Sequence, residues 1–107
     1  MAVSAGRQVL LDHVSEATWQ AQVRRWAERE GWHIHVVYNS RRSPEGWPDL
    51  FLVRNGRAIA AELKAVGGRL RREQGGWLVW LRECGIETYV WFPNQEAEVK
   101  RVLGVAA

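Results

Sequence analysis

Two short runs of this chain, Pro48-Asp49 and Glu62-Leu63-Lys64, carry residue types that could do chemistry. Between them lies Asn55-Gly56, a dipeptide that strongly favours a two-residue β-hairpin turn, with apolar residues on both sides. If this dipeptide forms the turn, the numbers of facing residues sum to 111. Asp49 then faces Glu62 across the hairpin, with Cβ atoms about 4.5–5.5 Å apart.

Two carboxylates that face each other should repel and destabilise a sheet. The pair becomes favourable when a divalent cation lies between the two acids and takes their oxygens as ligands. Lys64 points to the same face as Glu62, because side chains alternate along a strand. The hairpin therefore presents two acids and one ammonium at one place, which indicates a metal-dependent phosphodiesterase site. The alternative is an ordinary hairpin with an exposed Asp-Glu-Lys cluster.

The composition supports the chemical interpretation. The chain has 13 Arg but only two Lys, and only two Asp, and one of each scarce residue lies in the motif. A surface hairpin in such a chain would more naturally carry Arg, so Lys64 indicates a compact charge whose protonation can be tuned. Oxygen ligands favour Mg²⁺, with Mn²⁺ as a substitute, over zinc, which prefers His and Cys. We therefore expect Mg²⁺ as the cofactor.

Length and charge bound the class of protein. A chain of 107 residues predicts one domain. The net charge is +3 and the pI about 9.6. Basic residues on both sides of an acidic cluster are typical of nucleic-acid enzymes, although a solvated charged surface is the alternative for any one of them. The candidates for binding DNA phosphates are Arg41, Arg42, Arg69, Arg71 and Arg72.

The single cysteine and the lack of long apolar stretches predict a soluble, cytoplasmic protein. Cys84 has no partner for an intramolecular disulfide, and we expect it to lie in the core near the apolar face of a helix. No stretch approaches the roughly 20 apolar residues of a membrane span. The N-terminus has no secretory signal pattern.

A helix is predicted from the N-cap Ser15 to the stop at Gly31. Its buried stripe should consist of Trp19, Val23, Trp26 and Ala27. Before this helix, residues 1–14 form an N-terminal arm, in which the apolar run 9–11 fits either a short strand or a segment that packs on a neighbour.

Glu16 falls within the same stripe at about 100° per residue. One interpretation is a first-turn acid that is favoured by the helix dipole and reaches solvent from the fringe. The other is a third carboxylate that turns toward the metal.

Further strands are predicted at residues 32–38 and 86–92, and a last helix at about 95–103. His33 and His35 share one face of the first strand, where they form a polar face, a packed pair or metal ligands. Both faces of the hairpin are largely apolar, so we expect it inside a sheet covered on both sides.

A helix is also predicted from Leu70 to Cys84, with Leu70, Trp77, Leu78 and Leu81 on its inner face. Gln74 shares that face, either as an amphipathic edge residue or as part of the site. Gly75-Gly76 costs this helix about 1 kcal/mol per glycine relative to Ala, which suggests that the helix backbone lies close to another group there, either protein or DNA.

The order helix with acid, strand, hairpin, helix with Gln, strand, helix resembles the PD-(D/E)xK nuclease superfamily. Within it, the chain is most similar to the virus-type replication-repair nuclease (VRR-NUC) domain and the related Holliday junction resolvases. The resemblance covers about residues 15–103. It implies an α/β, restriction-endonuclease-like fold, in which helices flank both faces of a mixed sheet whose hairpin carries the active site. The matching residues are Glu16, Gly46-Trp47-Pro48-Asp49-Leu50, Ala61-Glu62-Leu63-Lys64 and Gln74.

The resemblance also implies a role for each matching residue. Asp49 and Glu62 would be the principal metal ligands, the Leu63 carbonyl would complete the inner shell, and Glu16 would act directly or through a water. Lys64 would position or help deprotonate the attacking water. In addition, Gln74 would orient Lys64 or a phosphate. Trp47, inside the Gly-x-Pro-Asp run, lies outside the pattern expected of the family, and it either packs under the sheet or stacks on a base.

Substrate and assembly follow from these expectations. Basic patches recognise the shape of DNA without reading bases. Two active sites in a symmetric homodimer suit a four-way junction, whose opposed strands are nicked together. We therefore expect a Holliday junction resolvase of bacterial or phage origin, which acts in recombination, repair or phage DNA processing. The family resemblance implies products with 5′-phosphates and 3′-hydroxyls. A less selective flap or branch endonuclease and an inactive DNA-binding scaffold are the alternatives.

Overall fold

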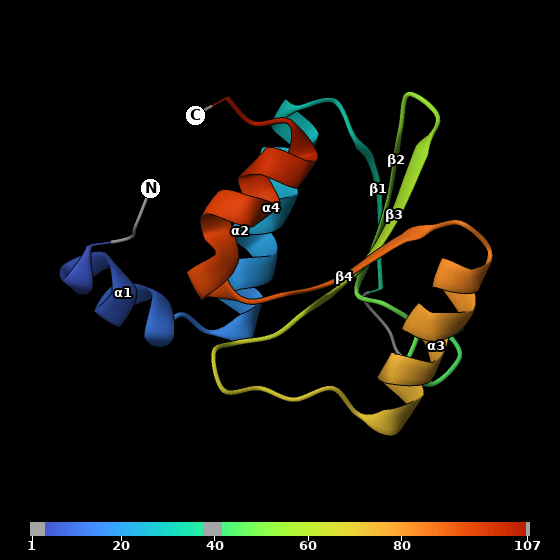
Figure 1. The fold of residues 1–107 in the computed structure, drawn as a ribbon, viewed down its shortest axis with the longest axis horizontal. Coiled ribbons are helices and arrows are strands. Elements are labelled where there is room, and N and C mark those ends of the chain that lie inside the picture. The colour runs from blue at the N-terminus through green and yellow to red at the C-terminus, as the bar shows by residue number, and fades with distance from the viewer. Residues whose placement is uncertain (1–3, 38–41, 107) are drawn as a thin grey trace.

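The computed structural model describes residues 4–37 and 42–106 of the chain. They form an α/β fold with a four-stranded mixed sheet and four α-helices in the described part (Figure 1). The first three strands are antiparallel neighbours, and the third and fourth run parallel. In spatial order the strands are β1 (His33–Val36), β2 (Leu50–Arg54), β3 (Arg57–Leu63) and β4 (Glu87–Trp91).

The hairpin between β2 and β3 has the predicted register. Leu50 pairs with Ala61 and Arg54 with Arg57, so the facing residue numbers sum to 111 as expected. The turn residues Asn55 and Gly56 both have positive φ, 48° and 78°. This is the backbone that a tight hairpin needs, because its twist matches that of the two strands.

The helices follow local start and stop signals. Ser15 caps α2 (Glu16–Arg29) by accepting a hydrogen bond from the Thr18 N–H, and Gly31 follows the helix with φ +80°. The other helices are α1 (Ala5–Asp12), α3 (Arg72–Glu83) and α4 (Glu96–Leu103), and the short 3₁₀ helix η2 (Pro93–Gln95) precedes α4.

The main core lies between one face of the sheet and helices α2 and α4. The predicted stripe of α2 is buried there in full. Two tryptophans satisfy their ring N–H groups inside this core: Trp19 donates to the Trp91 carbonyl and Trp32 to the Leu103 carbonyl, both at 2.9 Å. These bonds tie α2 and the start of β1 to the C-terminal part of the fold.

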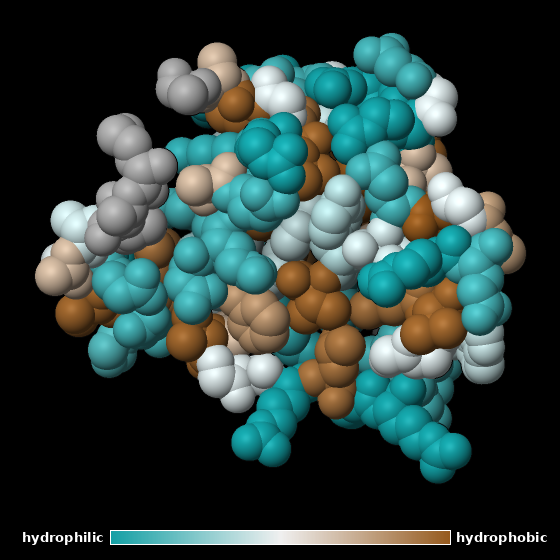
Figure 2. Space-filling model, in the orientation of Figure 1, coloured by the Kyte–Doolittle hydropathy of each residue, from teal (hydrophilic) through white to brown (hydrophobic). Residues whose placement is uncertain are grey.

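The opposite face of the sheet is covered by α3 over part of its area. Ala60 and Glu62 are buried on this face, but Val53, His33 and His35 are exposed. The prediction of a hairpin covered on both faces is therefore wrong at the turn end, because α3 does not extend over it (Figure 1). Figure 2 shows mostly hydrophilic side chains in this view, with hydrophobic ones between them, including some over α1 and α3.

Residues 9–11 belong to α1, so the predicted short strand is wrong. Ser4 caps this helix by accepting from the Arg7 N–H. The Arg7 guanidinium forms an ion pair with Glu96 at 2.7 Å, which links α1 to the start of α4. Leu11 is buried, while Val9 and Leu10 are exposed.

The predicted limits of the helix that became α3 were too wide. Leu70 lies before the helix and is exposed, because the Gln74 side chain accepts the Arg71 N–H and so fixes the first turn. Cys84 is the C-cap residue and is exposed, which corrects its predicted place in the core. Within residues 4–37 and 42–106, no helix is both long and apolar enough to cross a membrane.

Candidate active site

Asp49 lies directly before β2 and is held from both neighbouring strands. Its Oδ2 accepts a hydrogen bond from the Leu63 N–H at 2.9 Å. Its backbone carbonyl accepts from the Val37 N–H at 3.2 Å, just after β1. The carboxylate is therefore fixed next to the end of β3, as the hairpin register predicts.

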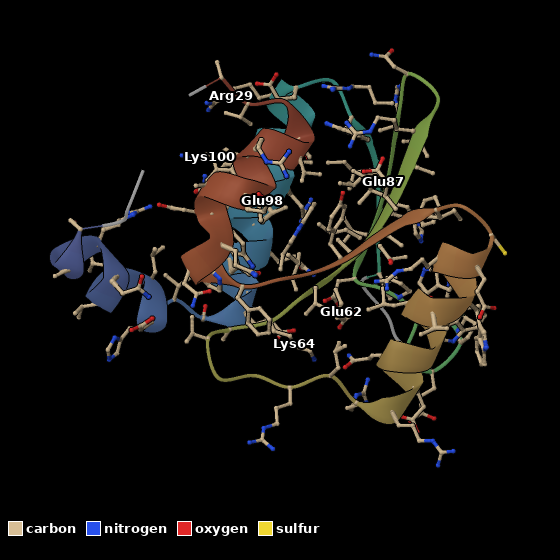
Figure 3. All side chains as sticks on the ribbon, in the orientation of Figure 1. Arg29, Glu62, Lys64, Glu87, Glu98 and Lys100 are labelled. Carbon is tan, nitrogen blue, oxygen red and sulfur yellow. The ribbon has the colours of Figure 1, made fainter. Side chains whose placement is uncertain are left out.

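Glu62, on β3, is 1 % exposed and lies on the face that α3 covers. Gln74 Nε2 donates to its Oε1 at 2.7 Å, and Lys64 Nζ lies 3.8 Å from the same oxygen. Figure 3 shows the Glu62 and Lys64 side chains near each other at the same end of β3. The second oxygen, Oε2, is buried and has no hydrogen-bond partner among the described residues. A buried carboxylate oxygen without a partner is unfavourable unless a proton or a cation compensates it.

The surroundings raise the pKa of Glu62 to about 8. Burial is the largest cause, because a charged carboxylate loses its hydration inside the protein. The negative charge of Asp49 is next, followed by the hydrogen bond that the two carboxyl groups can share when Glu62 is protonated. Lys64 acts in the opposite direction. Without a cation, Glu62 thus retains a proton at neutral pH.

Gln74 connects this carboxylate to the first turn of α3. Its Oε1 accepts the Arg71 N–H at 2.8 Å, while its Nε2 donates to Glu62. The amide is 6 % exposed, so it lines the site and is not an amphipathic edge residue. Among the described residues its side-chain partner is Glu62, whereas the family resemblance implied Lys64 or a phosphate.

Gly46 makes the close backbone approach that Gly75-Gly76 was expected to make. Its φ is +84°, and a Cβ at this position would lie 2.7 Å from the Gln74 N and closer still to the Glu73 carbonyl. Among the described residues, an added Cβ at Gly75 would meet nothing within 4 Å, and one at Gly76 would meet only the Trp80 ring, at 3.9 Å. Gly46 therefore lets the loop that carries Asp49 contact the first turn of α3. The glycine of the Gly-Trp-Pro-Asp run was the signal in the sequence for this approach, because glycine adopts positive φ without a steric penalty.

A cavity of about 200 Å³ opens beside Asp49 and Gln74. Of the five arginines predicted to bind DNA, Arg71 lines this cavity. Three more are exposed without lining it, and Arg41 lies outside the described residues. The remaining lining residues are Val37, Ser43, Pro44, Gly46 and Trp47. The exposed arginines are Arg42, Arg69 and Arg72.

Trp47 is half-buried and packs between other aromatic rings. It stacks on Phe51 with ring centroids 6.2 Å apart and meets the edge of Trp77 at 5.1 Å. Trp77 donates its ring N–H to the Glu45 carbonyl at 3.1 Å. The packing role considered for Trp47 accounts for these contacts.

Glu16 and the two histidines of β1 are not brought into a metal-binding cluster. Glu16 is exposed at the first turn of α2, outside the buried stripe in which its spacing placed it. Its position at the very start of the helix explains the difference, since the core begins one turn later, at Trp19. In residues 4–37 and 42–106, no group of three or more His, Cys, Asp or Glu side chains is placed to hold a metal ion. The site thus offers two carboxylates, and a role of Glu16 stays a prediction.

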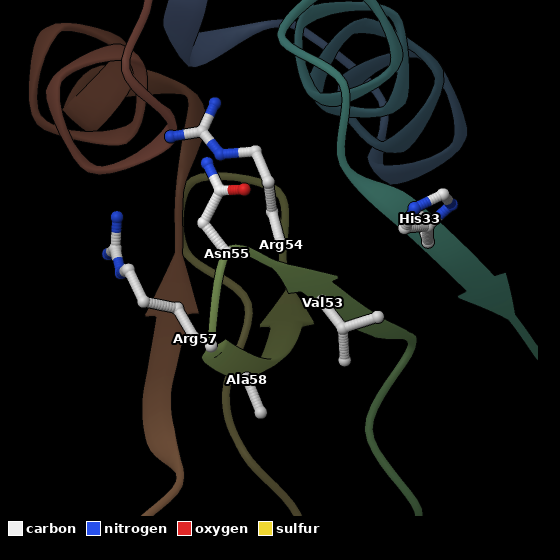
Figure 4. Close-up of a pocket in the computed structure, with 7 residues that line it drawn as sticks. His33, Val53, Arg54, Asn55, Arg57 and Ala58 are labelled. Atoms are coloured by element: carbon white, nitrogen blue, oxygen red, sulfur yellow. The ribbon is translucent and has the colours of Figure 1, made fainter.

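A second hollow, of about 370 Å³, lies at the turn end of the hairpin (Figure 4). Its two arginines are already engaged: Arg54 donates to the Glu30 carbonyl, and Arg57 forms an ion pair with Glu87 at 2.8 Å. Both guanidinium groups also lie over the Trp32 ring. These contacts make the hollow a structural feature of the turn, separate from the carboxylate pair.

Comparisons of this chain with models of known protein families, with curated proteins and with solved structures gave no match.

Proposed function

We propose that this protein is a Mg²⁺-dependent DNA endonuclease of the PD-(D/E)xK superfamily with a restriction-endonuclease-like fold. The order α2, β1, β2, β3, α3, β4 agrees with the order of elements on which the family resemblance rests. The hairpin also brings the family's Asp and Glu-x-Lys motifs to one end of β3. Both points support the proposal without depending on overall sequence similarity.

The observation that carries the proposal is the buried Oε2 of Glu62, which lies near a second carboxylate and has no hydrogen-bond partner in the described part of the chain. Two facing acids and one ammonium fit a divalent cation with oxygen ligands. Mg²⁺ is bound through one or two protein carboxylates, while waters and substrate phosphates complete its octahedron. Asp49 and Glu62 would hold the ion, with the Leu63 carbonyl as the further ligand that the resemblance implies. When bound, Mg²⁺ supplies a Lewis acid for the phosphate and acidifies a coordinated water.

The chain's own residues have separate tasks in this proposal. Gln74 keeps Glu62 oriented from α3, and the Leu63 N–H keeps Asp49 oriented from β3. Lys64, whose side chain is 11 % exposed, carries a positive charge next to the acids that can position the attacking water and offset phosphate charge. Arg71 lines the neighbouring cavity, where a guanidinium can hold a DNA phosphate in two-point contact.

For the substrate we propose branched DNA, with the four-way junction as the leading candidate and a homodimer as the active form. The exposed arginines on both sides of the acids favour recognition of the DNA backbone over the reading of bases. A flap or branch endonuclease of the same class is the nearest alternative. An inactive scaffold is less well supported, because Asp49, Glu62 and Lys64 are all present and close together.

The test is cleavage of a labelled four-way junction, linear duplex, flap and single strand, each with Mg²⁺ and with EDTA. We expect paired, symmetric nicks in the junction that are absent in EDTA and in Asp49→Asn. An asparagine can still accept the Leu63 N–H, so this variant should retain the fold. Asp12→Asn changes the chain's other aspartate, on exposed α1, and should cleave like the wild type.

Equal cutting of all four substrates would support the proposed nuclease activity but reject the preference for four-way junctions. Wild-type cleavage by Asp49→Asn would reject the proposed site. Binding without any cleavage, in the presence of Mg²⁺ or Mn²⁺, would favour the scaffold.

A further inference from the structure

Helix α3 has an outer face that nothing in the described part of the chain covers. Its inner side places Gln74 and Leu78 against the sheet. On the opposite side Val79 is 52 % exposed and Trp80 is 57 % exposed. Large exposed apolar side chains that adjoin one another mark interaction surfaces more often than isolated ones do. At ~100° per residue, Gly76 lies between Val79 and Trp80 at the centre of this outer face.

A hollow of about 410 Å³ lies beside the Trp80 ring, next to Gly76. Because Gly76 has no side chain, the helix backbone is accessible at this point, and an added Cβ would meet no described residue except Trp80, at 3.9 Å. Two of the three charged residues in its lining are acids, so the net charge disfavours a nucleic acid as the occupant, and Arg72, which the sequence predicted to bind DNA, lies on this face. The lining residues are Glu45, Arg72, Glu73, Gly76, Trp77 and Trp80.

The charged residues of this outer face can form ion pairs with those of the same face on a second copy of the chain. Arg72 stands at the first turn of α3 and Glu83 at its last residue, and both side chains are exposed. Neither takes part in an ion pair within the described residues. In an antiparallel pair of α3 helices whose facing positions sum to 155, Arg72 would lie level with the second copy's Glu83, and Gly76 with its Val79. A two-fold axis forms both charge pairs at once, as an isologous interface requires.

We propose that the outer face of α3 is the surface on which a second copy of this chain docks. The two helices pack antiparallel, each Trp80 enters the hollow beside the other copy's Gly76, and the Arg72–Glu83 pairs close both ends. The contact is small, because α3 has 12 residues, and small interfaces belong to weak complexes. A dimer with micromolar affinity is therefore expected. It would supply the homodimer of the proposed junction nuclease, but it rests on α3 alone and can hold or fail independently of cleavage.

Sedimentation velocity of the full chain, from low micromolar to several hundred micromolar, measures the dimer directly. Arg72→Glu alone and Glu83→Arg alone each place like charges at both ends of the pair. Each variant should dimerise about tenfold more weakly than the wild type. An equimolar mixture of the two restores opposite charges at both ends and should form a heterodimer. Arg25→Glu makes the same charge change as Arg72→Glu at an exposed position of α2 and serves as the control.

Two glycine substitutions test the packing without loss of the fold. Gly76→Gln places a long side chain at the centre of the outer face and should abolish the dimer. Gly6→Gln, at an exposed position of α1 where an added Cβ would meet nothing among the described residues within 4 Å, should leave the dimer intact. Both variants should raise the melting temperature, since Gln is the better helix former.

A wild type that stays monomeric at the highest concentration would overturn the proposal. So would a dimer that is unchanged in Gly76→Gln, or mixed charge variants that remain monomers where the wild type dimerises.

Discussion

The raised pKa of Glu62 makes the stability of the metal-free protein depend on pH in an unusual direction. Burial and the neighbouring charge of Asp49 raise this pKa from 4.5 to about 8 in the folded state. The unfolded chain retains the lower value, so between these pH values the native state binds more protons than the unfolded state. The free energy of unfolding must then fall as pH rises from about 4.5 to 8.

The size of this effect follows from the shift. Each pKa unit corresponds to about 1.4 kcal/mol. The rise of the Glu62 pKa from 4.5 to about 8 therefore lowers the free energy of unfolding by at most about 5 kcal/mol across this pH range. Since small domains unfold with 5–15 kcal/mol in total, roughly, such a loss is easily measured. Glu62→Gln removes the titrating group, and its amide can still accept from Gln74 and donate to Asp49. We therefore expect this variant to be more stable than the wild type at pH 8 in EDTA, and close to it at pH 5.

The assay is equilibrium unfolding in urea at several pH values, followed by the fluorescence of the chain's tryptophans. Mg²⁺ should remove the advantage of Glu62→Gln at high pH. An ion that binds only the folded state raises its stability, so Mg²⁺ should stabilise the wild type above pH 7. It should not stabilise Glu62→Gln, which lacks this carboxylate ligand. Glu28→Gln, at an exposed position of α2, is the matched control and should follow the wild type. Identical pH profiles for the wild type and Glu62→Gln would refute the buried, perturbed state of this carboxyl group.

Three further substitutions test how the site and the fold are held. Gly46→Ala should lower the free energy of unfolding by more than Gly67→Ala, in urea titrations. Both positions have positive φ, but of the two only the Cβ at residue 46 would press on α3, which adds about 1–3 kcal/mol to the loss of stability. Equal losses in the two variants would contradict the close contact between Gly46 and α3. Gln74→Ala leaves Glu62 Oε1 and the Arg71 N–H without this partner, so it should lower the free energy of unfolding by about 1–3 kcal/mol. It should also reduce the cleavage rate, and an unchanged rate would exclude a positioning role for Gln74. Arg7→Ala should change the unfolding free energy by less than about 1 kcal/mol, because its ion pair with Glu96 is half-exposed, and a larger loss would show that α1 is held mainly by this pair.

The sequence alone determined the features that depend on neighbouring residues. Asn55-Gly56 specifies a tight turn, and the turn together with the alternation of side chains sets the whole hairpin register. The register in turn places Asp49 opposite Glu62. Ser15 and the spacing from Trp19 to Ala27 fixed the start and the buried side of α2 in the same way. These signals act over a few residues, so they can be read without knowledge of the rest of the chain.

Tertiary structure decided the features that depend on segments far apart in the sequence. The start of α3 shifted because a side chain buried against β3 also caps the helix, and Gly46 was needed because that helix packs on the loop before β2. Glu16 and Cys84 are exposed because each lies at the end of its helix, beyond the area that the sheet covers. The buried, unpartnered oxygen of Glu62 and its raised pKa likewise result from the docking of α3. Spacing along the chain gives the residue types of the site, but burial, and with it the charge state, depends on what packs above them.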